Sequence, residues 1–169
     1  MIIEDIIESK KSDIIEKWFD LTAQSYSSDT AHFLKSQKDP FANPVGSNIF
    51  SCLKSLMDCL IKNHDNGVIK NFLDPIIRIR AVQTIFSPSQ AVSFIFDLKK
   101  ILKDALRKEL KDDGIKDGLL LFETRVDNLG LIAFDIFMEC REKIYDLKAN
   151  FEKNKFYRAF ERAGLISEL

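Results

Sequence analysis

Few residues in this chain have the types and spacing that metal binding would need. The chain has only two histidines, and the nearest approach to a metal motif is Asp29 followed three residues later by His32. A carboxylate-bridged di-iron site needs paired Glu-x-x-His motifs on facing helices, so Asp29 is better explained as a helix cap beside a surface histidine. Cys52 and Cys59 lie seven residues apart, too far for the Cys-x-x-Cys spacing of a zinc site. We therefore expect no bound metal.

The short motifs of the common enzyme classes are also missing. The six glycines form no phosphate-binding loop, and the sequence contains no Gly-x-Ser-x-Gly elbow. General bases are scarce because there are only two histidines. The three cysteines, which include Cys140, fall within apolar helical patterns, where cysteine acts as a small hydrophobic residue in a reducing compartment. The sequence thus predicts a cytoplasmic protein that is not an enzyme and holds no cofactor.

Three polar residues fall within apolar helical patterns. Arg80 and Gln83 share the apolar face of one predicted helix, and Arg125 lies within the apolar stripe of another. A buried guanidinium group needs partners. The favoured interpretation is a structural network in which an arginine pairs with a carboxylate such as Asp97 or Asp135. The alternative is that Arg80 or Arg125 anchors a small anionic or apolar ligand, because the planar guanidinium suits carboxylate and phosphate groups.

The elements that must position these residues are predicted to be helices. Apolar residues at intervals of three and four, together with turn residues between them, predict helices at about 2–26, 29–35, 44–63, 69–79, 88–110 and 118–162. Asn43–Pro44 and Ser87–Pro88 each provide a capping residue followed by a first-turn proline. Pro75 predicts a kink or a restart. Without any strand-length alternation, all 169 residues are predicted to form one all-α domain.

Charge and hydropathy exclude two classes of partner. The 25 basic and 26 acidic residues leave a net charge of −1, without the basic surplus of a protein that binds a phosphate backbone. No apolar stretch approaches the roughly 20 residues of a membrane span. The N-terminal region has acidic residues where a signal peptide would be basic. We expect neither nucleic-acid binding nor membrane insertion.

The segment 118–162 contains no proline and predicts one continuous helix with apolar residues on two opposite faces. The first face has the spacing of a core-facing seam and consists of Phe122, Val126, Leu129, Ala133, Ile136, Cys140, Ile144, Leu147 and Phe151. The second face consists of Leu120, Leu131, Phe134, Met138 and Tyr145. A monomeric domain needs only one such face. The second face therefore predicts a partner, most simply a second copy of the chain.

The same helix is too long for a compact domain of this size. At ~1.5 Å per residue it would span more than about 60 Å, so the segment 143–169 is expected to project or bend. Two successive steps of four residues, from 136 to 140 to 144, interrupt the first face like a coiled-coil stutter.

The stretch FLDPIIRIRAVQTIFSPSQAVSFIFDLKKIL, followed by ETRVDNLGLIAFDIFMECREKIY, resembles the N-terminal domain of RsbR and RsbRD-type proteins, the RsbT co-antagonists. The resemblance runs from Ile14 to about Tyr145. It rests on a helix with Arg78 and Arg80, a Ser-Pro-Ser-Gln cap, a Phe-rich helix and a long final helix. It implies a globin-like fold without haem, a homodimer and a signal-input role in bacterial stress pathways. No histidine occurs in 72–110, where a globin's proximal ligand would be expected, which agrees with the absence of haem.

The chain also departs from the full RsbR-like pattern. Those proteins continue after the long helix into a STAS domain that contacts the kinase, whereas this chain ends at Leu169. We therefore expect a stand-alone input domain, to which kinase and stressosome contacts do not transfer. The predicted function is a non-enzymatic sensory or signal-input module that acts through dimerisation and contacts with an unknown protein partner. The alternatives are a helical carrier for a small ligand and an accessory subunit of a larger complex, such as a respiratory one.

Overall fold

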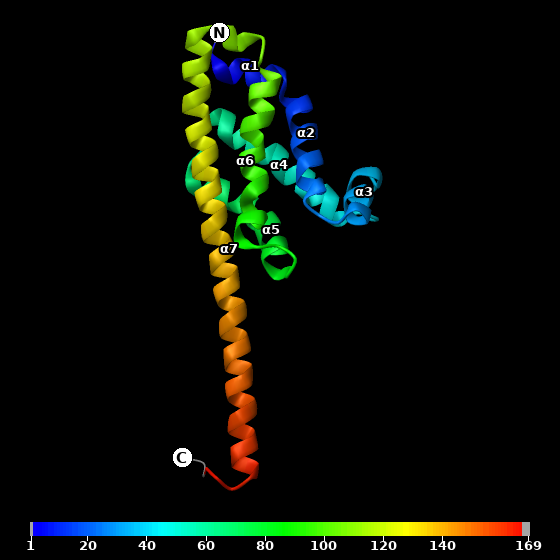
Figure 1. Ribbon diagram of the computed structural model, residues 1–169, viewed down its shortest axis with the longest axis vertical. Helices are drawn as coiled ribbons and strands as arrows, with labels where there is room; N and C mark the ends of the chain where they lie inside the picture. The colour runs from blue at the N-terminus through cyan, green and yellow to red at the C-terminus, as the bar shows by residue number, and fades with distance from the viewer. Residues whose placement is uncertain (1, 167–169) are drawn as a thin grey trace.

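The computed structural model describes residues 2–166, and 83% of the structure is helical (Figure 1). The elements are α1 (Ile3–Ser9), α2 (Lys11–Gln24), α3 (Ser28–Ser36), α4 (Pro44–Lys62), α5 (Asn66–Val82), α6 (Pro88–Ala105), a 3-10 turn (Glu109–Lys111) and α7 (Asp113–Arg162). The described residues contain no strand. The predicted all-α class and the long C-terminal helix are confirmed.

The two predicted cap-then-proline starts are both present. The Asn43 side chain is buried, accepts a hydrogen bond from the Gly46 amide at 2.8 Å, and donates to the carbonyls of Leu34 and Gln37 at 3.0 and 2.9 Å. A Cβ atom at Gly46 would lie 2.3 Å from the Asn43 amide nitrogen, so this turn requires glycine. At the start of α6, Ser87 and Gln90 form a reciprocal capping box.

The predicted opening helix at 2–26 is wrong, because the chain breaks at Lys10. The Lys10 backbone leaves the helical region, and its ammonium group donates to the Ala105 carbonyl at 2.8 Å and to Glu109 at 2.7 Å. The result is two helices, α1 and α2, instead of one. The predicted cap at Asp29 is also wrong, since Ser27 caps α3 by accepting from the Thr30 amide.

Other features of the helices differ from the prediction. The helix predicted to begin at residue 69 begins at Asn66, because Asp65 accepts hydrogen bonds from the Gly67 and Val68 amides. Pro75 lies inside α5 without a restart, and both Pro75 and Asn71, whose carbonyl loses its helical donor, are exposed to water. The helix predicted at 88–110 ends at Ala105 and is followed by the 3-10 turn. The long helix begins five residues earlier than Gly118, because Asp112 accepts hydrogen bonds from the Gly114 and Ile115 amides.

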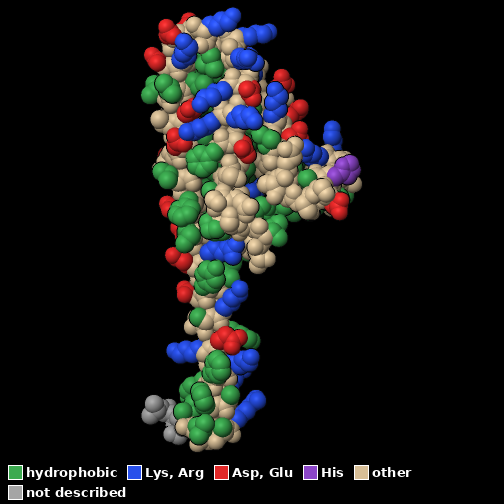
Figure 2. Space-filling model, in the orientation of Figure 1, with side chains coloured by type: hydrophobic (Ala, Val, Ile, Leu, Met, Phe, Trp, Pro, Cys, Tyr) green, Lys and Arg blue, Asp and Glu red, His purple; other side chains and the backbone are tan. Residues whose placement is uncertain are grey.

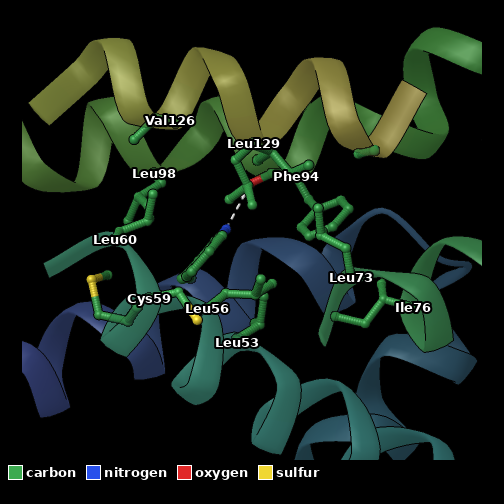
Figure 3. Packing of buried hydrophobic residues seen from close by; sticks show 14 of the residues in the cluster. Leu53, Leu56, Cys59, Leu60, Leu73, Ile76, Phe94, Leu98, Val126 and Leu129 are labelled. Atoms are coloured by element: carbon green, nitrogen blue, oxygen red, sulfur yellow. Dashed lines mark hydrogen bonds between the residues drawn. The ribbon is translucent and has the colours of Figure 1, made fainter. Parts of the chain in front are cut away.

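The hydrophobic core lies between α2, α4, α5, α6 and the first half of α7, where side chains from all five helices meet (Figure 3). Trp18 of α2 lies at its centre with no exposed surface. Its indole nitrogen donates to the Phe94 carbonyl of α6 at 2.7 Å, the bond marked by the dashed line in Figure 3, and its ring stacks on the Phe94 ring. This contact joins the first large helix to the middle of the chain.

The long helix α7 has two different halves. Its first half packs against α5 and α6, and its last buried residue is Cys140. Its second half extends away from the other helices as a narrow tail (Figures 1 and 2). The first face was predicted to face the core as far as Phe151, which is wrong beyond Cys140: Leu147 and Phe151 are 70% and 68% exposed. The apolar spacing continues beyond Cys140, but no other helix within the described residues covers this part of α7.

Candidate functional site

Arg80 of α5 is completely buried, although it carries a charge. One terminal nitrogen donates to the Ser25 hydroxyl at 2.8 Å and to the Thr22 carbonyl at 3.2 Å, both at the end of α2. The other terminal nitrogen is 3.4 Å from the Gln90 carbonyl and 3.5 Å from the Ala91 carbonyl, in the first turn of α6. Arg80 thus connects three helices through their carbonyl and hydroxyl oxygens.

Three aromatic rings enclose the same guanidinium group. Its carbon atom lies 5.1 Å from the ring centre of Tyr26, 4.8 Å from that of Phe86 and 4.7 Å from that of Phe94. These distances are those of cation–π contacts. Burial lowers the pKa of Arg80 from its usual value. The predicted pairing with Asp97 or Asp135 is wrong, since no ion pair to Arg80 occurs within residues 2–166; ring faces and carbonyls stabilise the charge instead.

Arg141 is a neighbouring arginine that sequence reasoning missed. It follows Cys140 on α7, packs over the Phe137 ring at 5.2 Å, and donates to the backbone carbonyls of Gln83 and Phe86 at 3.4 and 3.2 Å. Gln83, predicted as a buried polar residue, is half-buried at the end of α5 and contributes its backbone carbonyl. Arg141 therefore holds the α5–α6 loop against α7 at the point where α7 leaves the body, which consists of α1 to α6 and the first half of α7. The only hint in the sequence was the position of this arginine directly after Cys140, where the spacing of the first face is interrupted.

Arg125 of α7 does pair with a carboxylate, but not with a predicted one. Its terminal nitrogens donate to Glu4 of α1 at 2.8 Å and to the Leu60 carbonyl of α4 at 2.9 Å. The pair is partly buried, with 26% and 22% of the two side chains exposed. The partner could not be predicted, because Glu4 lies 121 residues away along the chain.

Replacing Arg125 with glutamine is expected to lower the free energy of unfolding by about 1 kcal/mol, because a partly buried charged hydrogen bond is lost. Urea unfolding would measure this loss, and hydrogen exchange would show faster exchange in α1. Lys116→Gln is the matched control, since Lys116 pairs with Asp113 on the surface and should cost less than about 0.5 kcal/mol. Equal losses in both variants would contradict a bracing role for Arg125.

The two predicted ligand anchors donate through their terminal nitrogens to oxygen atoms of the chain, whereas the buried Nε of Arg80 has no hydrogen-bond partner among the described residues. Arg80 is enclosed by protein atoms, and Arg125 borders only a shallow hollow between α4 and α7, with His64 and Asn128. Among residues 2–166, no group of three or more histidine, cysteine or acidic side chains is close enough to hold a metal ion. Both arginines therefore connect helices to one another through hydrogen bonds within the chain.

The second face of α7 is open to solvent. Leu120, Leu131, Phe134 and Tyr145 are between 45% and 66% exposed, and Met138 is half-buried against the core. On the opposite side of the same helix, Phe122, Val126, Leu129, Ala133 and Ile136 have no exposed surface. The helix therefore has one covered and one uncovered apolar face over the same length.

The profile of the family described as RsbT co-antagonist protein rsbRD N-terminal domain matches residues 12–150, which is most of the chain. The chain belongs to this family. The rsbRD N-terminal domain is a globin-like helical domain, so the predicted globin-like fold is confirmed. It is a regulatory or sensory domain, which agrees in outline with the predicted signalling role.

One curated relative of this rsbRD N-terminal domain is an uncharacterized protein from Archaeoglobus fulgidus. The two are 28% identical over 80 residues, which cover 47% of this chain and 49% of the relative. The aligned part is therefore about half of that protein's length. No solved structure gives a significant match.

The rsbRD N-terminal domain profile includes Arg80, Arg125 and Arg141 but ends at residue 150. Beyond residue 150, α7 has further exposed aromatic side chains, which are not part of the predicted second face. They are Phe151, Phe156, Tyr157 and Phe160. Figure 2 shows hydrophobic and basic side chains interleaved along this tail. None of the helices in the described part of the chain is both long enough and apolar enough to cross a membrane.

Proposed function

We propose that this domain is a non-enzymatic signal-input module of the cytoplasm that works as a homodimer through the second face of α7. The observation that supports the dimer is the uncovered apolar face on a helix whose opposite face is fully buried. Large exposed apolar patches on soluble proteins are typical of protein–protein contacts. The three free cysteines, two of them buried, agree with a reducing compartment.

The proposed route of the signal is α7 itself, which continues without interruption from the body into the tail. Arg141 contacts the α5–α6 loop where α7 leaves the body, and Phe86 of that loop packs against Arg80 and Tyr26. A change of packing around Arg80 would thus move the anchor of α7. The stutter near Cys140 is the proposed pivot, at which paired α7 helices would shift between two arrangements and present a different surface to a protein partner.

The test replaces Leu131 and Phe134 with glutamate together. Both side chains are exposed, so the variant should fold, while two charges on each copy would oppose an apolar contact. We expect native mass spectrometry to show a dimer for the wild type and a monomer for Leu131→Glu/Phe134→Glu. Ile85→Glu is the matched control, because Ile85 is 65% exposed in the α5–α6 loop and should leave the dimer intact.

A dimer that survives in Leu131→Glu/Phe134→Glu would remove the second face from the interface, and a monomeric wild type would overturn the homodimer. The same spectra test the ligand-carrier alternative. A reproducible additional mass that is lost on denaturation would favour a carrier over a module that acts through protein contacts alone.

A further inference from the structure

A shallow groove with an acidic lining lies between α7 and the start of α5. Its α7 side is formed by Ile132, Asp135, Met138, Glu139 and Glu142, and its α5 side by Asn66, Gly67 and Lys70. Lys70 pairs with Glu139 at 3.1 Å. Asp135 and Glu142 have no ion pair within the described residues. The groove therefore has an apolar floor, formed by Ile132 and Met138, and an excess of negative charge along its rim.

On the tail, the side of α7 that continues from this groove has aromatic and basic residues in place of the carboxylates. Eighteen residues complete five helical turns, so residues that many positions apart lie on the same side of α7. Lys153, Phe156, Tyr157 and Phe160 follow Asp135, Met138, Glu139 and Glu142 at this interval. The tail thus has aromatic side chains and a lysine on the side where the body has carboxylates and an apolar floor.

The net charge of the tail has the matching sign. Residues 148–162 contain five basic side chains, Lys148, Lys153, Lys155, Arg158 and Arg162, and two acidic ones, Glu152 and Glu161. None of these seven side chains forms an ion pair within residues 2–166. Phe156, Tyr157 and Phe160 are 59%, 50% and 49% exposed.

We propose that the partner in this groove is the tail of a second copy of the chain, so that the two α7 helices of the dimer run antiparallel. This inference rests on the proposed homodimer and specifies its arrangement. A parallel pairing through the same side would place Asp135, Glu139 and Glu142 against their own copies, which is unfavourable. The antiparallel pairing places each set of carboxylates against a basic, aromatic tail, and two-fold symmetry forms the contact twice.

The length of the tail agrees with the length of the partner's α7 along which it would lie. If the two-fold axis crosses α7 at residue 146, Lys153 of one copy lies level with Glu139 of the other, seven residues on either side of the axis. Phe160 then lies level with Ile132. Because the other helices of the body end near Arg141, the tail is free to lie along the partner's groove as far as Gly130. The overlap from 130 to 162 is about 50 Å long at ~1.5 Å per residue. Leu120, predicted as part of the interface, lies outside this overlap.

Disulfide trapping tests the arrangement with two variants that each add one cysteine, Tyr157→Cys and Asp135→Cys. The background is Cys52→Ser, in which the remaining native cysteines, Cys59 and Cys140, are buried. Residues 157 and 135 are level across the proposed axis, whereas two copies of residue 157 would be about 33 Å apart, too far for a disulfide. We expect cross-linking on oxidation when the two variants, one carrying a mass tag, are co-expressed. Neither variant should cross-link to itself.

The other outcomes separate this inference from the proposed dimer. Self-cross-linking of Tyr157→Cys would show a parallel pair and overturn the inference while the homodimer stands. A dimeric mass without any cross-link would also overturn the inference. A monomeric mass at every concentration would overturn both the homodimer and its arrangement.

A charge reversal provides a second test that needs no cross-link. Lys153→Glu should weaken the wild-type dimer at least tenfold in Kd, because it places a carboxylate against Glu139 and its acidic neighbours. Lys155→Glu is the matched control, since Lys155 is two residues further on and points away from the groove-facing side of α7. An unchanged Kd in Lys153→Glu, or an equal loss in both variants, would contradict the antiparallel contact.

Discussion

Replacing Arg80 with alanine is expected to lower the free energy of unfolding by about 3–5 kcal/mol, in the range of a large-to-small core substitution. The change leaves a cavity between the rings of Tyr26, Phe86 and Phe94 and removes the two shortest hydrogen bonds that join α5 to α2. Urea unfolding followed by circular dichroism would measure the loss. Arg78→Ala is the matched control, because Arg78 is exposed and pairs with Asp74 on the surface of α5, and it should cost less than about 1 kcal/mol.

A second substitution separates the charge of Arg80 from its volume. Arg80→Met fills most of the space beneath the rings and relieves the desolvation of the guanidinium group. The Thr22 carbonyl still accepts from the Ser25 hydroxyl, so we expect Arg80→Met to lose only about 1–2 kcal/mol. A loss as large as that of Arg80→Ala would contradict this account and show that the positive charge itself is required. Retained ligand mass that disappears in Arg80→Met would instead support the anchor hypothesis.

Local sequence signals correctly predicted the starts of α4 and α6, because those two starts are determined by neighbouring residues. Asn43 and Ser87 are caps whose hydrogen bonds reach three residues along the chain. The break at Lys10 was not predictable in this way. It depends on Ala105 and Glu109, which lie 95 and 99 residues away in sequence.

The buried arginines illustrate the same limit at the candidate site. Periodicity correctly predicted that Arg80 would lie among apolar residues, but it identifies only the face of a helix and not the groups opposite. The actual neighbours come from the end of α2, the α5–α6 loop and α6, three regions whose convergence only the tertiary fold determines. Arg141 was missed for the same reason, since its partners are backbone carbonyls that no sequence pattern distinguishes.

Trp18→Ala is the second substitution for which we expect a loss of about 3–5 kcal/mol, typical of removing a fully buried aromatic side chain. Trp18 has no exposed surface, and its indole donates to the Phe94 carbonyl at 2.7 Å. The loss should spread to the arginine cluster, because the Phe94 ring that stacks on Trp18 also lies 4.7 Å from the Arg80 guanidinium carbon. Unfolding must be followed by circular dichroism, since the variant lacks the only tryptophan.

Two further variants show whether Trp18 acts through its volume, its hydrogen bond or neither. Trp18→Phe keeps an aromatic ring and loses the indole donor, and the Phe94 carbonyl, which lies inside α6, retains its helical partner; about 1–2 kcal/mol should be lost. Phe41→Ala is the control for removing an aromatic ring, because Phe41 is 98% exposed, and it should change the free energy of unfolding by less than about 0.5 kcal/mol. A Trp18→Ala loss below about 1 kcal/mol would contradict the packing of α2 on α6, on which the enclosure of Arg80 and the anchoring of α7 through Phe86 both depend.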